Sequence, residues 1–329
     1  MMKSLFLVAA LIAAPPILHA QFWHALPPVD TNHTISACFS NDEKKAFYLS
    51  KDGGVANIWG MTIADKYGRI IAGPANPPIQ ITKFTDRSIV RFFHLLNRPE
   101  ILFMRLADDG KDYHIYRIKD DGSELQDLTP GGEGVTSEII GLSYNGKFVY
   151  YTNNKVSRDK VDVYRYDTQQ FSSDLVFPND KDYFTIAWTR DQKKLLLEDS
   201  SANSMMFYDI ESTDRAPQQI DAGEKIGAVM LDPGSPKIQV FDLTDFKQKP
   251  IPLDYSPNCK YVVYSESGKL IVKDAASNTD LSLPEGYYPL AIAPKETLLI
   301  YSLPSPGNSS KIFLYDISKN SSTELASAR

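Results

Sequence analysis

Few side chains in this sequence have the spacing that catalysis or metal binding requires. Histidine and cysteine most readily supply general bases, nucleophiles and zinc ligands. The chain has five histidines and two cysteines, Cys38 and Cys259. No pair of them shows a zinc-site spacing, and two cysteines so far apart in the chain give no geometric reason for a bridge. We therefore predict no metal site, no cofactor and two unpaired thiols.

The sequence also lacks the motif of a serine hydrolase nucleophile, Gly-x-Ser-x-Gly. The segments at 232–237 and 265–269 both lack the flanking pair of glycines. A near match to a phosphate-binding loop, at 141–148, has Phe148 where a hydroxyl should bind Mg²⁺, so Asn145-Gly146 is better interpreted as a hairpin turn. No catalytic template fits.

Acidic residues gather in two clusters, at 108–112 and 120–124. Neither has the Asp-x-Asp-x-Asp-Gly spacing of a calcium loop. The clusters flank a single strand, so they would lie at its opposite ends and could not converge on one ion. We therefore interpret both as solvated turns.

The elements that would position any site are short alternating strands. Residues 112–132 read as a strand, an Asp-Gly turn and a second strand. Related hairpins recur at 57–71, 162–177, 205–220, 238–253, 270–283 and 312–325. In five of them an aspartate ends the first strand, and its carboxylate should accept a backbone hydrogen bond that sets the turn: Asp167, Asp209, Asp242, Asp274 and Asp316.

A second pattern repeats in phase with these hairpins: a short apolar run, a polar turn and a hydrophobic strand. It occurs at 40–50, 96–106, 143–152, 189–199, 256–265 and 293–302. Each unit then has four antiparallel strands in roughly 35 to 55 residues, the period of propeller blades. The seven units start near residues 35, 88, 137, 183, 226, 253 and 288.

These units predict an all-β fold, a β-propeller of four-stranded antiparallel blades, because no segment sustains a helical apolar period. Seven blades are favoured. The fifth unit lacks an obvious second strand, so it is either incomplete or merged with its neighbour, which would leave six.

The N-terminus has the pattern of a secretory signal, with Lys3 before an apolar run from Leu5 to Ala14. We predict a signal peptide at 1–20, cleaved after Ala20, a leading segment at 21–34 and a single propeller domain at 35–329. The mature chain would be periplasmic or secreted, without an integral membrane segment. The net charge of −6 and the lack of a basic cluster argue against a nucleic-acid partner.

The blade motifs resemble those of TolB-like and WD-repeat-like β-propellers. Residues 107–154 also resemble the N-terminal propeller of prolyl oligopeptidase-family serine peptidases, of which the acylaminoacyl-peptidase-like branch is the nearest. In that family the catalytic residues belong to an α/β-hydrolase domain that follows the propeller. Here the last repeat reaches about Leu325, close to the final residue Arg329, so we expect no such domain and no peptidase residue to transfer.

The leading hypothesis is an exported, non-catalytic propeller that binds a protein or peptide partner; its oligomeric state is left open. Binding residues are expected on the connections between second and third strands, which share one face. These candidates are Lys51, Asp52, Asp108, Asp109, Lys111, Asn153, Arg158, Asp199 and Ser200. The alternatives are an enzyme with a central-channel site that acts on glycan or peptide, and a gating subunit of a separately encoded serine hydrolase.

Overall fold

The computed structural model describes residues 36–328 with internal gaps, and every regular element among them is a β-strand. The gaps are residues 52–53, 74, 144, 182, 189–191, 200–203, 213–215, 220–225, 232–237, 243–250, 257–259, 267–268 and 306–308. The predicted signal peptide and leading segment lie outside the described residues. Within them, no helix is long and apolar enough to cross a membrane.

The first four sheets each contain four antiparallel strands that follow one another in chain order. The first sheet has β1 (Ala37–Phe39), β2 (Lys45–Ser50), β3 (Asn57–Thr62) and β4 (Ile79–Gln80). The second has β5 (Ile89–His94), β6 (Glu100–Leu106), β7 (Tyr113–Lys119) and β8 (Gln126–Asp127). The third has β9 (Ser137–Leu142), β10 (Phe148–Ser157), β11 (Lys160–Asp167) and β12 (Ser172–Phe177), and the fourth has β13 (Phe184–Trp188), β14 (Lys194–Asp199), β15 (Ser204–Asp209) and β16 (Gln218–Gln219).

The remaining strands form three more sheets in the described part of the chain. The fifth sheet pairs β17 (Ile226–Leu231) with β18 (Ile238–Asp242). The sixth has β19 (Ile251–Tyr255), β20 (Tyr261–Glu266) and β21 (Lys269–Asp274), and the seventh has β22 (Tyr288–Ile292), β23 (Leu298–Ser305), β24 (Ser309–Asp316) and β25 (Ser321–Ala328).

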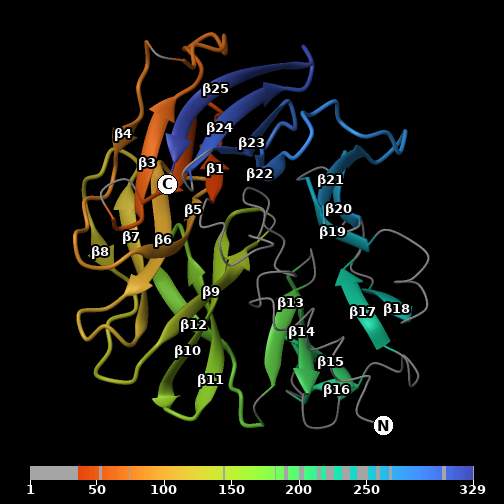
Figure 1. Cartoon of the computed structure of the whole chain (residues 1–329). Coiled ribbons are helices and arrows are strands. Elements are labelled where there is room, and N and C mark those ends of the chain that lie inside the picture. The colour runs from red at the N-terminus through yellow and green to blue at the C-terminus, as the bar shows by residue number, and fades with distance from the viewer. Residues whose placement is uncertain are drawn as a thin grey trace.

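The sheets stand around a common centre, with the first strand of each nearest to it (Figure 1). The second strands β2, β6 and β23 are buried along most of their length on both faces. A half-exposed sheet would alternate buried and exposed residues instead. Continuous burial follows because each sheet is covered on both sides by its neighbours.

The hydrophobic cores accordingly lie between sheets. One cluster joins the first and second sheets through Phe47 and Phe103, and another joins the sixth and seventh through Val263 and Leu299. A third cluster packs Tyr48 of the first sheet against Ile300 of the seventh, so the two ends of the described chain meet by apolar packing. This arrangement is a β-propeller.

The predicted repeat matches the sheets closely: each sheet begins within two residues of its predicted start. Within the described residues, the fifth and sixth units form separate sheets of two and three strands, and the hairpin predicted at the end of the sixth is reduced to a bridge between Lys273 and Asp280. The number of blades remains a prediction.

The first sheet differs from the predicted hairpin at 57–71. Its fourth strand is β4, further along the chain, because Asp65 closes a small loop of its own. The Asp65 carboxylate accepts hydrogen bonds from the backbone N–H groups of Tyr67 (2.8 Å) and Arg69 (3.0 Å).

The aspartates that end the third strands set the turns as predicted. Asp167 accepts hydrogen bonds from the backbone of Gln169 (2.8 Å) and Gln170 (2.9 Å), and Asp274 from that of Ala276 and Ser277. Asp209 and Asp316 accept equivalent bonds. The Asp242 side chain lies outside the described part of the structure.

Six of the seven first strands contain a β-bulge near their first residues, which the sequence did not reveal. The register shifts place Val90, Ile140, Ile186, Gly227, Leu253 and Leu290 opposite no partner. A bulge leaves the extra residue outside the ladder and re-aims the side chains beside it. The bulges therefore alter which side chains line the centre of the propeller.

The antiparallel meander gives the disc two different faces. The connections between second and third strands, and those that lead from one sheet to the next, emerge on one face, which we call the loop face. The turns between first and second and between third and fourth strands emerge on the other, the turn face.

Cys38 lies buried in β1 with a free thiol. Burial raises the pKa of this thiol, and a hydrogen bond with the His94 backbone opposes the shift. Such a thiol is protonated and unreactive at neutral pH. Cys259 lies outside the described residues.

Candidate functional site

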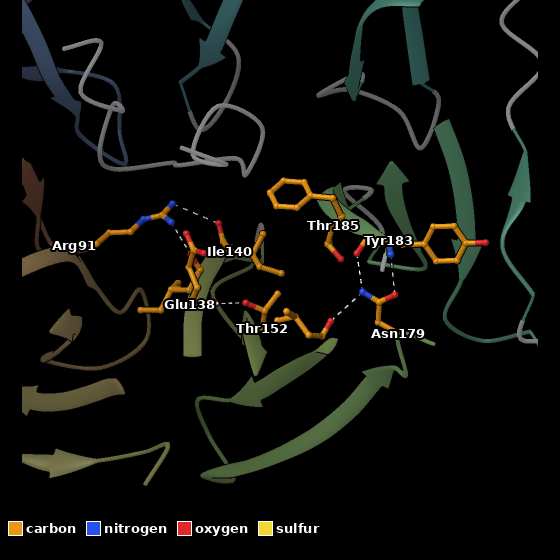
Figure 2. A pocket seen from close by; sticks show the side chains of 10 residues that line it. Arg91, Glu138, Ile140, Thr152, Asn179, Tyr183 and Thr185 are labelled. Carbon is orange, nitrogen blue, oxygen red and sulfur yellow. Dashed lines mark hydrogen bonds between the residues drawn. The ribbon is translucent and has the colours of Figure 1, made fainter. Parts of the chain in front are cut away.

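A pocket of about 210 Å³ opens near the loop face, between the inner strands of the second, third and fourth sheets (Figure 2). Its lining is Arg91, Glu138, Ile139, Ile140, Thr152, Val161, Asn179, Tyr183, Phe184 and Thr185. Most of this surface is apolar, and Arg91 and Glu138 are the charged members among these residues.

The bulge in β9 explains the position of Arg91. Its guanidinium donates hydrogen bonds to the carbonyl oxygen of Ile139 (2.6 Å) and to that of the bulged Ile140 (3.5 Å), as Figure 2 shows. A buried carbonyl without a ladder partner costs free energy unless a donor reaches it. Arg91 supplies that donor from the neighbouring sheet, and its guanidinium also lies 5.1 Å from the Phe93 ring.

The Glu138 carboxylate lies beside this arginine on the third sheet. Burial raises the pKa of Glu138, and the Arg91 charge opposes that shift. Burial in turn lowers the pKa of Arg91 to about 9, with Glu138 opposing, so the guanidinium stays charged at neutral pH. Within the described residues, the Glu138 carboxylate accepts no hydrogen bond and therefore has acceptor capacity for a molecule in the pocket.

The far wall is held by Asn179, in the connection between the third and fourth sheets. Its side-chain amide donates to the carbonyl oxygens of Tyr183 (2.6 Å) and Val161 (3.1 Å), and its carbonyl accepts from the Tyr183 backbone N–H (2.9 Å). Figure 2 shows these bonds next to Tyr183 and Thr185. These hydrogen bonds fix the connection to the beginning of β11, so this wall of the pocket is held in place.

Exposed apolar side chains line this pocket or lie on the strands that form it. Phe184 and Val161 line it and keep 37% and 40% of their surface exposed. Val156, near the tip of the long β10–β11 hairpin, is 71% exposed. Val90, beside Arg91, is 49% exposed. Exposed apolar groups gathered at a concave site are typical of binding surfaces.

None of the nine residues predicted for binding lines the pocket. Lys51, Asp108, Asp109, Lys111 and Arg158 are exposed on the connections between second and third strands, as expected from topology. Asp52 and Ser200 lie outside the described residues. A binding role for these positions remains a prediction.

Two of the nine are not loop residues. Asn153 lies inside β10 and is buried: its side chain donates to Ser137 Oγ (2.6 Å) and accepts from the Lys155 backbone (2.7 Å). It fastens the two inner strands of the third sheet, and the prediction of a surface contact there is wrong. Asp199 is the half-buried last residue of β14, opposite Ser204.

Within the described residues, no group of three or more His, Cys, Asp or Glu side chains is arranged to hold a metal ion. The two acidic clusters form turns instead. Asp109 accepts from the Lys111 backbone (2.9 Å) and Asp121 from the Ser123 backbone (2.9 Å). His114 lies with Nδ1 2.7 Å from an Asp127 carboxylate oxygen.

Arg91 and Glu138 are not among the predicted binding residues, although the sequence carries one signal for them. Both stand in the short apolar runs that begin the units. The remaining residues of these runs are almost all uncharged. A charge in such a run is costly unless it has a partner or a function. A search of the inner runs for ionisable residues would have found this pair.

Fold and site together define a β-propeller with a small, mainly apolar pocket at its inner strands. No protein-family model matches the chain. Over 159 residues, 44% of the chain, the sequence is 25% identical to dipeptidyl aminopeptidase BIII from Pseudoxanthomonas mexicana, and the match covers 21% of that protein.

A solved structure gives the same fold. A prolyl endopeptidase structure is similar over 91% of this chain and 50% of its own, with a TM-score of 0.54 and 13% identity. TolB from Acinetobacter baumannii is similar over 96% of this chain and 66% of its own, with a TM-score of 0.36 and 14% identity. The resemblance to the fold of peptidase propellers is confirmed, and the chain spans about half the endopeptidase and about a fifth of the aminopeptidase.

Proposed function

We propose that this chain is an exported β-propeller that binds a protein or peptide partner without transforming it, and that one partner side chain anchors in the pocket between the second, third and fourth sheets. The observation that carries the proposal is the pocket itself: apolar walls, two opposed charges and an apolar rim that includes Phe184 and Val161. The signal-like N-terminus supports export.

The size of the pocket favours an anchor rather than a complete ligand. Small-molecule sites usually measure roughly 300–1,000 Å³, whereas an apolar cavity of about 150 Å³ holds a benzene ring. A space of about 210 Å³ therefore suits one large side chain. The rest of a peptide would lie over the loop face, where exposed polar connections can contact it.

An enzyme with a central-channel site is the second candidate, because two buried carboxyl groups lie in this region. Burial raises the pKa of Glu138 and of Glu198. Glu198 lies opposite Phe184 in the β13–β14 pairing but does not line the pocket. Glycoside hydrolysis needs two carboxyl groups facing one bond. A single lining carboxylate favours binding over that chemistry.

A third candidate, a companion of a separately encoded hydrolase, is supported by the partial match to an aminopeptidase. Here the partner would be the hydrolase itself. Co-purification of the two products from cells would favour this candidate over an unrelated peptide partner.

The proposal is tested by selecting peptides from a random display library on the purified full chain. The affinity of a selected peptide is then measured by calorimetry for the wild type and for Val161→Ala and Phe184→Ala. Truncation of an anchor contact commonly weakens binding by about 1–2 kcal/mol, about five- to thirtyfold. Leu175→Ala, at an exposed apolar residue of the outer strand β12, is the matched control and should bind as the wild type does.

The proposal fails if no peptide is selected, or if both pocket variants bind the selected peptides as well as the wild type and the control do. The enzyme hypothesis would be supported instead if the pure chain turned over a glycan or peptide and Glu138→Gln abolished that turnover.

A further inference from the structure

The charges and the size of the pocket restrict what it can hold. Its charged lining residues are one arginine and one glutamate, which lie close enough to influence each other's ionisation. Their charges cancel. A charged side chain that entered would be attracted by one of them and repelled by the other, while losing its own hydration. An uncharged group avoids that cost.

The walls add a second restriction. Ile139, Ile140, Val161 and Phe184 offer mostly carbon surface, which suits the faces of an aromatic ring. A sugar ring carries hydroxyl groups around its whole edge, and most of them would lack partners here. The pocket volume of about 210 Å³ exceeds that of an apolar cavity of roughly 150 Å³ that binds benzene.

The third restriction concerns hydrogen bonding. The Arg91 donors already reach the carbonyl oxygens of Ile139 and Ile140. The Glu138 carboxylate accepts no hydrogen bond from the described residues. A bound molecule that carries a hydrogen-bond donor could therefore bond to this carboxylate. A neutral ring that carries one O–H donor meets all three conditions.

We infer that the pocket is a tyrosine-anchor site: it takes the phenol side chain of a partner peptide, with the hydroxyl group donating to Glu138 and the ring against Val161 and Phe184. This inference rests on the proposed function and names the chemistry of the anchor. A hydrogen bond to an ionised group is roughly twice as strong as one between neutral groups, so Glu138 supplies the preference for tyrosine over phenylalanine.

The test uses blocked single residues, so that no terminal charge contributes. Binding of N-acetyl-tyrosinamide, N-acetyl-phenylalaninamide, N-acetyl-lysinamide and N-acetyl-glutamic acid amide to the full chain is followed by ligand-observed NMR. The tyrosine probe should bind about fivefold more tightly than the phenylalanine probe, and both charged probes at least about tenfold more weakly than tyrosine.

Glu138→Gln leaves the Arg91 charge uncompensated. The tyrosine advantage over phenylalanine should shrink to less than about twofold, and the glutamic acid probe should gain about tenfold. The control is Glu133→Gln, at a side chain that is 82% exposed and outside the pocket lining. It should reproduce the wild-type order. The affinities of the charged and uncharged probes are compared on the same variant. A modest loss of stability affects all probes alike and therefore does not change their order.

A wild-type preference for the lysine or glutamic acid probe, or equal affinity for tyrosine and phenylalanine, would overturn the inference. So would tighter binding of methyl glucoside, which would indicate a glycan site. If selected peptides require Val161 and Phe184 but anchor through a charged residue, only the tyrosine assignment fails. If they do not require these residues, the proposed function fails with it.

Discussion

Arg91 stands on an inner strand because the backbone of the next sheet needs its hydrogen bonds. Its donors reach two carbonyl oxygens at the β9 bulge, one at 2.6 Å. A charged donor can satisfy both acceptors from a neighbouring strand, and a shorter or apolar side chain cannot.

Arg91→Met should therefore lower the free energy of unfolding by about 2 kcal/mol, since buried carbonyl groups lose a charged donor. Chemical denaturation measures the change. Arg158→Met, at an exposed turn residue, should shift the value by less than about 0.5 kcal/mol. Equal effects of the two substitutions would contradict the structural role of Arg91.

Glu138 makes stability depend on pH in a predictable direction. Burial raises the pKa of its carboxyl group above the usual 4.5, so the folded state holds this proton more tightly than the unfolded state. The contribution of Glu138 to stability is complete below the unfolded pKa and is lost as pH rises through the folded pKa.

Unfolding free energies of the wild type and Glu138→Gln, compared from pH 4 to pH 7, test this sign. The glutamine variant resembles the protonated acid, so the wild type should lose stability relative to it as pH rises from about 4. A difference that is independent of pH, or that runs the other way, would show that Glu138 is not desolvated in the fold.

The turns between first and second strands join neighbouring sheets as well as neighbouring strands. Gly146 occupies the left-handed region (φ +66°), and a Cβ there would lie 2.5 Å from the Leu96 Cβ of the second sheet. Only glycine supplies both the conformation and the space.

Gly146→Ala should cost about 2–4 kcal/mol of stability, from left-handed strain and from overpacking against Leu96. Thermal unfolding measures the loss. Gly132→Ala is the matched control, because its Cβ would meet nothing within 4 Å and its φ is not positive. A comparable loss in the control would show that the close approach at Gly146 is not the cause.

The sequence predicts some of these features and conceals others. Turn residues such as Asp167 and Asp274 are visible because their type and position recur in five of the seven hairpins. The bulges are not visible, because an extra residue such as Ile140 is as apolar as the residues beside it and leaves no mark on the pattern. The pocket depends on those bulges, so its lining could not be deduced.

The polarity of single residues led to a wrong prediction of a loop at Asn153. Asn153 is polar and lies just after a hydrophobic run, which suggests a loop. It is in fact buried and bonded within β10, because that strand continues to Ser157. Strand length is set by pairing with β11, a tertiary property that the polarity of single residues does not report.

At the scale of the whole molecule, the first and seventh sheets meet without sharing a strand in the described structure. Apolar packing is assisted by Glu43, whose buried carboxylate accepts hydrogen bonds from the Lys295 backbone and from Thr297 Oγ1. Glu296 makes an equivalent contact between the seventh and sixth sheets: its carboxylate accepts hydrogen bonds from Ser256 Oγ and from the Lys260 backbone. Each acid fastens its own turn to the turn of the preceding sheet.

Glu43→Ala should weaken this junction by about 1–3 kcal/mol and speed amide hydrogen exchange in β1 and β22 more than in β10. Glu324→Ala removes an exposed ion pair with Lys311 in the same sheet and should change neither strand appreciably. Uniform acceleration across the sheets would mean that the contact contributes to overall stability rather than to closure.

The most direct test of the account is hydrogen exchange of the full chain with and without a display-selected peptide. Binding at the pocket should slow exchange around Glu138–Ile140, Val161 and Phe184–Thr185, and leave the turn face and the outer strand β25 unchanged. Protection confined to the turn face or to outer strands would place the partner elsewhere and contradict the proposed binding site.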